Sequence, residues 1–206
     1  MNNDKIIICV TGASSNSGKT TTACMLIERL KNCAALKTVT VTNEEKHSCP
    51  KGKPCGVCES LCSNWDLYED IETITKEGTD TAKLYNAGAR PTLWLVTKID
   101  YLKEAFLEIL AKIDNHILII EGNGVPSIYK CDINIMVLST NGLIKKSAYK
   151  ILKYIDFFVI LDKNRKSIDD IIKNQPFELN KPIYCLDDSK DREKFLNNIE
   201  EKINGK

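Results

Sequence analysis

The chain has 206 residues, which is enough for one well-packed domain and short for two. Apolar residues make up 43% of it and charged residues 28%, and the formal net charge is only +1, so nothing in the composition favours binding to nucleic acid or to a membrane surface. No apolar run reaches the roughly 18 residues that a membrane span requires. Residues 1–5 lead directly into an apolar segment without a signal-peptide profile, so we expect a cytoplasmic protein.

The apolar segments of the chain alternate between short runs and longer stretches with helical spacing. The short runs predict strands at residues 5–10, 39–42, 92–96, 117–120, 133–138, 157–161 and 183–186. The longer stretches predict helices at residues 19–31, 81–89, 101–113, 143–154 and from about residue 192 to the C-terminus. Strands that alternate with helices form right-handed βαβ units. We therefore expect one domain over residues 1–206, with a three-layer α/β/α fold of the P-loop NTPase type and a mostly parallel sheet.

The segment between the first predicted strand and the first predicted helix matches a phosphate-binding loop. The usual pattern is Gly, four residues, then Gly-Lys-Ser/Thr, and here Ala13 takes the first position directly after Gly12. Small residues let backbone N–H groups point at phosphate oxygens, while Lys19 adds a positive charge and Thr20 offers a hydroxyl to Mg²⁺. We expect this loop to bind a nucleoside triphosphate, either GTP or ATP, through Gly12, Ala13, Ser14, Ser15, Asn16, Ser17, Gly18, Lys19, Thr20 and Thr21.

A P-loop site also needs a carboxylate near Mg²⁺, usually at the end of a buried strand. Glu121 follows the most apolar strand of the chain, residues 117–120, and we predict that it binds Mg²⁺ directly or through water. Glu121 and Lys19 are accordingly the candidate catalytic residues. The alternative is a carboxylate that only ends a strand at the protein surface, in which case Asp80 and Glu44 are the next candidates.

Two segments resemble the guanine-reading motif Asn/Thr-Lys-x-Asp. Residues 97–100 read Thr-Lys-Ile-Asp but precede Glu121, which is the wrong chain order for an ordinary GTPase. Residues 162–165 follow a predicted strand in the expected place, but Asp162 replaces the asparagine and Arg165 replaces the aspartate. Neither segment distinguishes guanine from adenine.

Residues 47–63 form an insert rich in cysteine, proline, glycine and lysine. Its cysteines have the spacing C-x5-C-x2-C-x3-C, and four thiolates can hold a tetrahedral Zn²⁺ ion or an iron–sulfur cluster. Zn²⁺ is favoured because the spacing matches no standard ferredoxin run; free thiols in a loop and a transient metal cargo are the alternatives. The predicted metal ligands are Cys49, Cys55, Cys58 and Cys62, with His47 as a further candidate.

Two stretches of the chain resemble the MobB family, the GTP-binding adaptor of molybdenum cofactor (molybdopterin-guanine dinucleotide) biosynthesis. Residues 77–81 read Glu-Gly-Thr-Asp-Thr and residues 86–89 read Asn-Ala-Gly-Ala, similar to that family's Gly-x-Asp-Ser/Thr and Ala-Gly-Ala segments. The family also ends its Walker B strand in Glu-Gly, as residues 121–122 do here. Residues 142–146 and 156–163 look more like metallochaperone GTPases such as HypB. The cysteine-rich insert is not part of the usual MobB pattern.

The resemblance implies an accessory NTPase that acts in metal-cofactor biosynthesis or metal insertion. Its partners would be a nucleoside triphosphate and a metalloenzyme or cofactor-synthesis protein, and the protein would be a homodimer with weak GTPase or ATPase activity. Two other functions stay open from the residues alone. One is a small-molecule kinase or ligase that uses the P-loop, and the other is a metal-sensing or storage module in which nucleotide does not alter metal affinity.

Overall fold

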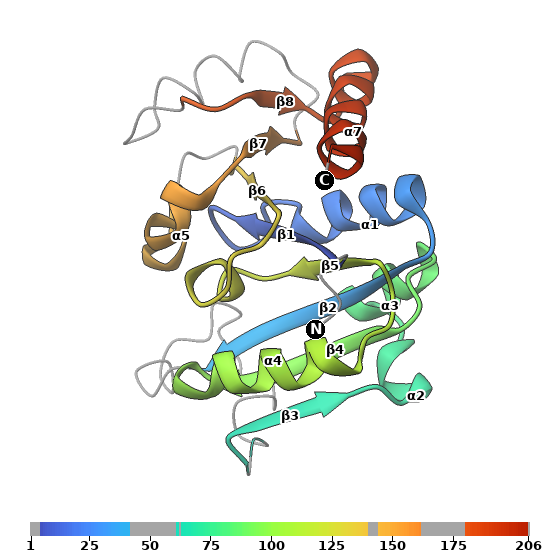
Figure 1. The fold of residues 1–206 in the computed structure, drawn as a ribbon, viewed down its shortest axis with the longest axis vertical. Helices are drawn as coiled ribbons and strands as arrows, with labels where there is room; N and C mark the ends of the chain where they lie inside the picture. The colour runs from blue at the N-terminus through green and yellow to red at the C-terminus, as the bar shows by residue number, and fades with distance from the viewer. Residues whose placement is uncertain (1–4, 42–60, 62, 140–143, 162–179, 206) are drawn as a thin grey trace.

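The computed structural model describes residues 5–41, 61, 63–139, 144–161 and 180–205. In these ranges the strands form a single eight-stranded sheet in the order β3-β4-β2-β5-β1-β6-β7-β8 (Figure 1). Within this sheet only the pairing of β3 with β4 is antiparallel; the other neighbours are parallel. The strands are β1 (Ile6–Gly12), β2 (Cys33–Val41), β3 (Trp65–Tyr68), β4 (Thr92–Lys98), β5 (Ile117–Glu121), β6 (Ile133–Val137), β7 (Phe157–Ile160) and β8 (Ile183–Cys185).

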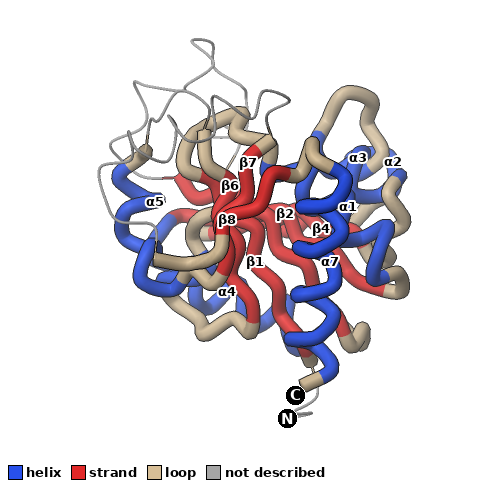
Figure 2. Tube along the Cα trace, turned by 90° about the horizontal axis from the view of Figure 1, so that it is seen from above, coloured by secondary structure: helices blue, strands red, loops and turns tan. Residues whose placement is uncertain are grey.

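Helices cover both faces of this sheet, as expected for a parallel sheet whose strands are connected by crossovers. In the part of the chain that the structure describes, the α-helices are α1 (Lys19–Leu30), α2 (Ile71–Ile74), α3 (Asp80–Asn86), α4 (Leu102–Lys112), α5 (Lys146–Ile151) and α7 (Ser189–Asn204), and short 3₁₀ turns span Ile99–Tyr101, Val125–Ser127 and Leu152–Tyr154. Figure 2 shows α1, α3 and α7 on one side of the sheet and α4 and α5 on the other. The expected three-layer α/β/α architecture with a mostly parallel sheet is confirmed.

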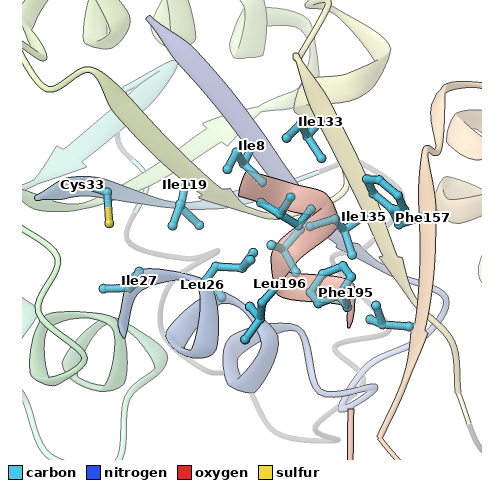
Figure 3. Packing of buried hydrophobic residues seen from close by; sticks show 14 of the residues in the cluster. Ile8, Leu26, Ile27, Cys33, Ile119, Ile133, Ile135, Phe157, Phe195 and Leu196 are labelled. Carbon is cyan, nitrogen blue, oxygen red and sulfur yellow. The ribbon is translucent and has the colours of Figure 1, made fainter. Parts of the chain in front are cut away.

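Alternation along the central strand β1 divides the core between the two faces. Ile6, Ile8 and Val10 of β1 pack against α1 and α7, where Leu26, Phe195 and Leu196 are fully or almost fully buried (Figure 3). Ile7 and Cys9 point to the opposite face and belong to a second cluster that contains Phe106 of α4. None of the helices in the described ranges is long and apolar enough to span a bilayer.

Several predicted boundaries differ from the structure. β2 begins at Cys33 rather than at residue 39, because residues 33–36 are completely buried between β4 and β5 although alanine is a poor strand former. β3 has no counterpart among the predicted strands; it is a short edge strand whose Tyr68 stacks on Trp94 of β4, with ring centroids 4.8 Å apart. α7 begins at Ser189 rather than at about residue 192, because the Asp188 side chain caps it. The predicted insert at residues 47–63 lies almost entirely outside the described residues.

The end of β5 lies unusually close to β2, and this contact positions the site described below. Gly122 has φ 153°, and a Cβ atom on it would lie 2.0 Å from the Thr38 hydroxyl oxygen and 2.9 Å from the Thr38 carbonyl oxygen. The carbonyl oxygen belongs to a strand paired on both sides and has little room to move. Glycine at this position therefore lets β5 and β2 hold the residues that precede Gly122 and Thr38 side by side.

We predict that Gly122→Ala lowers the free energy of unfolding by about 1–3 kcal/mol more than Gly88→Ala, the range typical of overpacking. Gly88 is the matched control, because it also has a positive φ (109°), but a Cβ atom added to it would meet no atom within 4 Å. Urea denaturation of both variants and the wild type measures the difference. Equal losses of stability would show that the close approach of β5 to Thr38 is not a constraint on the fold.

Candidate functional site

The predicted phosphate loop connects β1 to α1 at the carboxyl end of the sheet. The Ala13 N–H donates to the Val137 carbonyl oxygen at 2.9 Å, which ties the start of the loop to β6. Gly18 ends the loop with φ 100°, a left-handed conformation that favours glycine, and a Cβ atom there would lie 2.0 Å from Cδ1 of Leu161. α1 begins at Lys19, so the N–H groups of its first turn face the loop without partners within the helix. Such an end attracts anions.

Lys19 extends back over the loop that precedes it. Its Nζ atom donates to the Ser14 carbonyl oxygen at 3.2 Å. Burial lowers the pKa of this ammonium group, and the positive charges of Lys37 and Lys145 lower it further, against the opposing effect of Glu121. Lys19 is thus a partly desolvated cation among other cations, an environment that an incoming phosphate group would stabilise.

Glu121 is at the centre of a network of polar side chains from different elements. Its carboxylate is almost completely buried, with 1% of the side-chain surface exposed. The Thr20 hydroxyl donates to Glu121 Oε2 at 3.0 Å, and the Lys37 ammonium group contacts Glu121 Oε1. The same ammonium group donates to Asp80 Oδ2 at 2.8 Å. The network brings one hydroxyl, two carboxylates and a lysine to the end of the phosphate loop.

The backbone explains why these residues meet. β2 and β5 pair in parallel, and Lys37 is the direct partner of Glu121 in the ladder, so their side chains leave the same face of the sheet. Asp80 is the first residue of α3, which begins there because the Thr79 hydroxyl accepts a hydrogen bond from the Ala82 N–H. Glu121, Lys37 and Asp80 therefore come from separate parts of the sequence but are held by regular elements.

The electrostatics of the network favour the charged forms of Lys37 and Asp80. Burial alone would lower the pKa of Lys37, but the Glu121 carboxylate and the hydrogen bond to Asp80 outweigh it and the pKa is raised. Partial burial alone would raise the pKa of Asp80, yet the hydrogen bond and the charge of Lys37 outweigh it, and the pKa is lowered. The result is an ammonium group held between two carboxylates beside the phosphate loop.

Asn123 fastens the start of the loop to the end of β5. The Gly12 N–H donates to Asn123 Oδ1 at 2.9 Å, and Asn123 Nδ2 donates to the Gly12 carbonyl oxygen at 2.8 Å. This paired contact satisfies both backbone groups of Gly12 where the strand ends. It also couples the position of the loop to that of Glu121, two residues before Asn123.

The residues fit a Mg²⁺ ion bound together with a triphosphate. Thr20, Asp80 and Glu121 offer only oxygen atoms, the ligands that Mg²⁺ prefers. The Ser17 hydroxyl is buried in the loop and has no hydrogen-bond partner among the described residues, so its donor is available to a phosphate oxygen. Within the described ranges, no group of three or more His, Cys, Asp or Glu side chains is placed to hold a metal ion. A metal here would thus depend on the hydroxyl and on phosphate oxygens as well as on the two carboxylates.

The structure brings together most of the predicted loop residues, but not all the segments predicted from motifs. Ser15, Asn16 and Thr21 are exposed. The Thr97–Asp100 segment lies at the end of β4, separated from β1 by β2 and β5, and Lys98 Nζ donates to Asn64 Oδ1 at 3.1 Å. The remaining predicted site residues lie outside the described ranges: Glu44, His47, Cys49, Cys55, Cys58, Cys62 and residues 162–165.

Lys37 and Asn123 are site residues that the sequence patterns do not identify. The patterns miss Lys37 because they place the start of β2 at residue 39, beyond it. The signal that could have drawn attention to Lys37 is one charged side chain in the otherwise uncharged residues 33–41, but its role follows only from its register with Glu121. Asn123 has no such signal, since an asparagine after Glu-Gly also suits a turn.

Comparison with known proteins identifies the fold and not the function. No family model and no curated protein matches the chain. Among solved structures, HypB from Helicobacter pylori in complex with nickel matches over 98% of this chain and 89% of that chain, at 15% identity and a TM-score of 0.51. LpxK from Aquifex aeolicus in complex with ATP is 16% identical with a TM-score of 0.47; 88% of this chain is covered but only about half, 53%, of LpxK. A plasmid partition protein from Borrelia burgdorferi is 15% identical over 97% of this chain and 100% of that chain, with a TM-score of 0.46. The likeness to HypB shows that the chain has the α/β fold of P-loop NTPases.

Proposed function

We propose that the chain binds a Mg²⁺–nucleoside triphosphate complex at residues 12–21 and acts as an accessory NTPase in metal-cofactor biosynthesis or metal insertion. The observation that carries the nucleotide site is the convergence of Thr20, Asp80 and Glu121 beside the phosphate loop and Lys19. A loop motif alone can arise by chance, but oxygen ligands from α1, α3 and β5 that meet at its end are the arrangement that a Mg²⁺ ion beside an anion requires.

Each part of the site has a task in this proposal. The backbone N–H groups of residues 14–18 and the first turn of α1 bind the phosphate oxygens, and Lys19 turns from the Ser14 carbonyl oxygen toward the terminal phosphates. Thr20, Asp80 and Glu121 would hold Mg²⁺, which neutralises charge on the phosphates and supplies Lewis acidity during their hydrolysis. Asn123 keeps the loop in register with Glu121 through Gly12.

The role in molybdenum-cofactor biosynthesis rests on the resemblance to the MobB family. In the structure the segment that carries this resemblance reaches the candidate site, because Asp80 contacts Lys37 and Thr79 caps the start of α3. A segment that both resembles the family and contacts the site supports the same use of nucleotide. The recipient metalloenzyme or cofactor-synthesis protein and a homodimeric state remain predictions.

The base of the nucleotide would lie near residues 162–165. Leu161, the last described residue before them, packs close to Gly18 of the phosphate loop. Residues 97–100, by contrast, follow β4, which is separated from β1 by β2 and β5.

The cysteine-rich insert is proposed to bind one Zn²⁺ ion or an iron–sulfur cluster through Cys49, Cys55, Cys58 and Cys62. The insert follows β2, the strand that carries Lys37, and its last described neighbour on that side is Val41. A metal-dependent change at the end of β2 would act on a strand that contributes directly to the nucleotide site. This connection supports coupling between metal and nucleotide.

We predict that Lys19→Ala weakens triphosphate binding by about 10–100-fold while the protein stays folded. The lost charge-assisted hydrogen bonds are worth about 1.5–3 kcal/mol, and each 1.4 kcal/mol is a factor of about ten. Calorimetry with GTP and with ATP measures the change. The control is Lys103→Ala, an exposed lysine on α4 on the other side of the sheet. Unchanged affinity in the Lys19 variant would contradict the phosphate site.

We also predict that anaerobically purified protein contains about one metal centre per chain and that a Cys55→Ser/Cys58→Ser variant loses it. Cys24→Ser, at a half-buried position on α1, is the control and should retain the metal. If the insert is coupled to the site, nucleotide and metal must change each other's affinity by the same factor, typically about 5–150-fold. Metal titrations of nucleotide-free, diphosphate-bound and triphosphate-analogue-bound protein measure this factor. Equal affinities in the three states would exclude coupling, and metal retained by the double variant would exclude the site.

A further inference from the structure

Lys37 is the one member of the network whose chemistry conflicts with a bound metal ion. An ammonium group has three donors and no acceptor, so it cannot share a coordination position with Mg²⁺. Thr20 differs, because its hydroxyl can rotate and turn a lone pair toward a cation. In the structure both lysine contacts are made to the oxygens that the proposed metal site needs, Glu121 Oε1 and Asp80 Oδ2.

The remaining oxygens of the two carboxylates are also engaged. Glu121 Oε2 accepts from Thr20 at 3.0 Å, and Asp80 Oδ1 lies 3.5 Å from the Lys83 ammonium group. Lys83 is 59% exposed and contacts Asp80 along one turn of α3, so water can replace it easily. The Lys37 side chain is only 16% exposed and joins two elements. A cation that enters between the carboxylates must therefore displace Lys37 and not Lys83.

We propose that Lys37 is a built-in counter-ion of the metal site, which occupies the Glu121 and Asp80 carboxylates in the nucleotide-free protein and is displaced when Mg²⁺ binds. This inference rests on the proposed Mg²⁺–triphosphate site. It gives Lys37 a regulatory task in that site: free Mg²⁺ competes with a tethered cation and binds weakly. The triphosphate adds its own oxygen ligands to the metal and offers the displaced ammonium group new anionic partners.

The location of Lys37 supports both halves of this exchange. Removing the lysine without a replacement would leave Glu121 buried and unpaired, which is costly, so an empty site needs a cation from the protein itself. The positive charge of Lys37 also acts on Lys19, so the ammonium group already lies within electrostatic reach of the phosphate loop. A short movement of one side chain is enough to change its partners, since β2 itself is fixed between β4 and β5.

The first test is Lys37→Gln, whose amide can still donate a hydrogen bond to one carboxylate and so favours folding. Melting temperatures are measured in nucleotide-free protein against MgCl₂ at constant ionic strength. We expect the apparent dissociation constant for Mg²⁺ to fall about tenfold or more relative to the wild type, a factor that corresponds to about 1.4 kcal/mol. Lys83→Gln is the matched control and should respond as the wild type does. A Lys37 variant with the wild-type Mg²⁺ response would overturn the proposal.

The second test uses the wild type and holds even when the variant does not fold. Nucleotide-free protein is treated briefly with an amine-acylating reagent, and mass spectrometry compares the modification of Lys37 with that of Lys83 across a Mg²⁺ titration. Displacement should raise the acylation of Lys37 several-fold and leave that of Lys83 nearly unchanged. If the acylation rate of Lys37 stays constant up to saturating Mg²⁺, the lysine forms a permanent structural ion pair with the carboxylates and the proposal is wrong.

Triphosphate binding by the wild type in EDTA separates this inference from the proposed function. If the wild type binds no triphosphate either in EDTA or with Mg²⁺, the proposed nucleotide site is wrong. If it binds triphosphate but Lys37 does not respond to Mg²⁺ in either test, only the proposed role of Lys37 is wrong.

Discussion

The site depends on one buried charge, the carboxylate of Glu121. With 1% of its side chain exposed it cannot rely on water, and its contacts to the Thr20 hydroxyl and the Lys37 ammonium group replace the lost hydration. Breaking a buried ion pair by removing one partner typically costs about 3–5 kcal/mol. The elements that carry those partners, α1 and β2, are consequently held in place by the same interaction that prepares the site for a metal ion.

The fold makes this interaction possible by where the strands end. β1, β2 and β5 are parallel and adjacent in the sheet, with β5 in the middle, so the loop after β1, Lys37 of β2 and Glu121 of β5 face one region. Gly122 lets β5 approach Thr38 closely, and Asn123 returns to Gly12 at the start of the loop. The crossovers on one face supply both α1 and α3, whose first turns complete the network. Chemistry at the carboxyl ends of the strands is what this class of fold favours.

Sequence patterns are sufficient to predict those parts of the molecule whose structure depends mainly on residues that are neighbours in the chain. The phosphate loop and Glu121 can be recognised because motif, strand and helix lie next to each other in the chain. Lys37 and Asn123 cannot, since their roles come from register: Lys37 matters only because β2 pairs with β5 at that residue. The pattern makes β2 too short because buried alanines resemble no strand pattern, and it misses β3 because the four residues of that strand depend on pairing with β4.

The most direct measurement of the central claim is a crystal structure of the protein with Mg²⁺ and a non-hydrolysable triphosphate. The account predicts phosphates along residues 13–20, and a metal ion at about 2.0–2.1 Å from the Thr20 hydroxyl oxygen, with the Asp80 and Glu121 carboxylates bound to it directly or through water. It also predicts that Lys37 has left Glu121. A triphosphate bound elsewhere, or a metal ion without contact to Thr20, Asp80 and Glu121, would contradict the account.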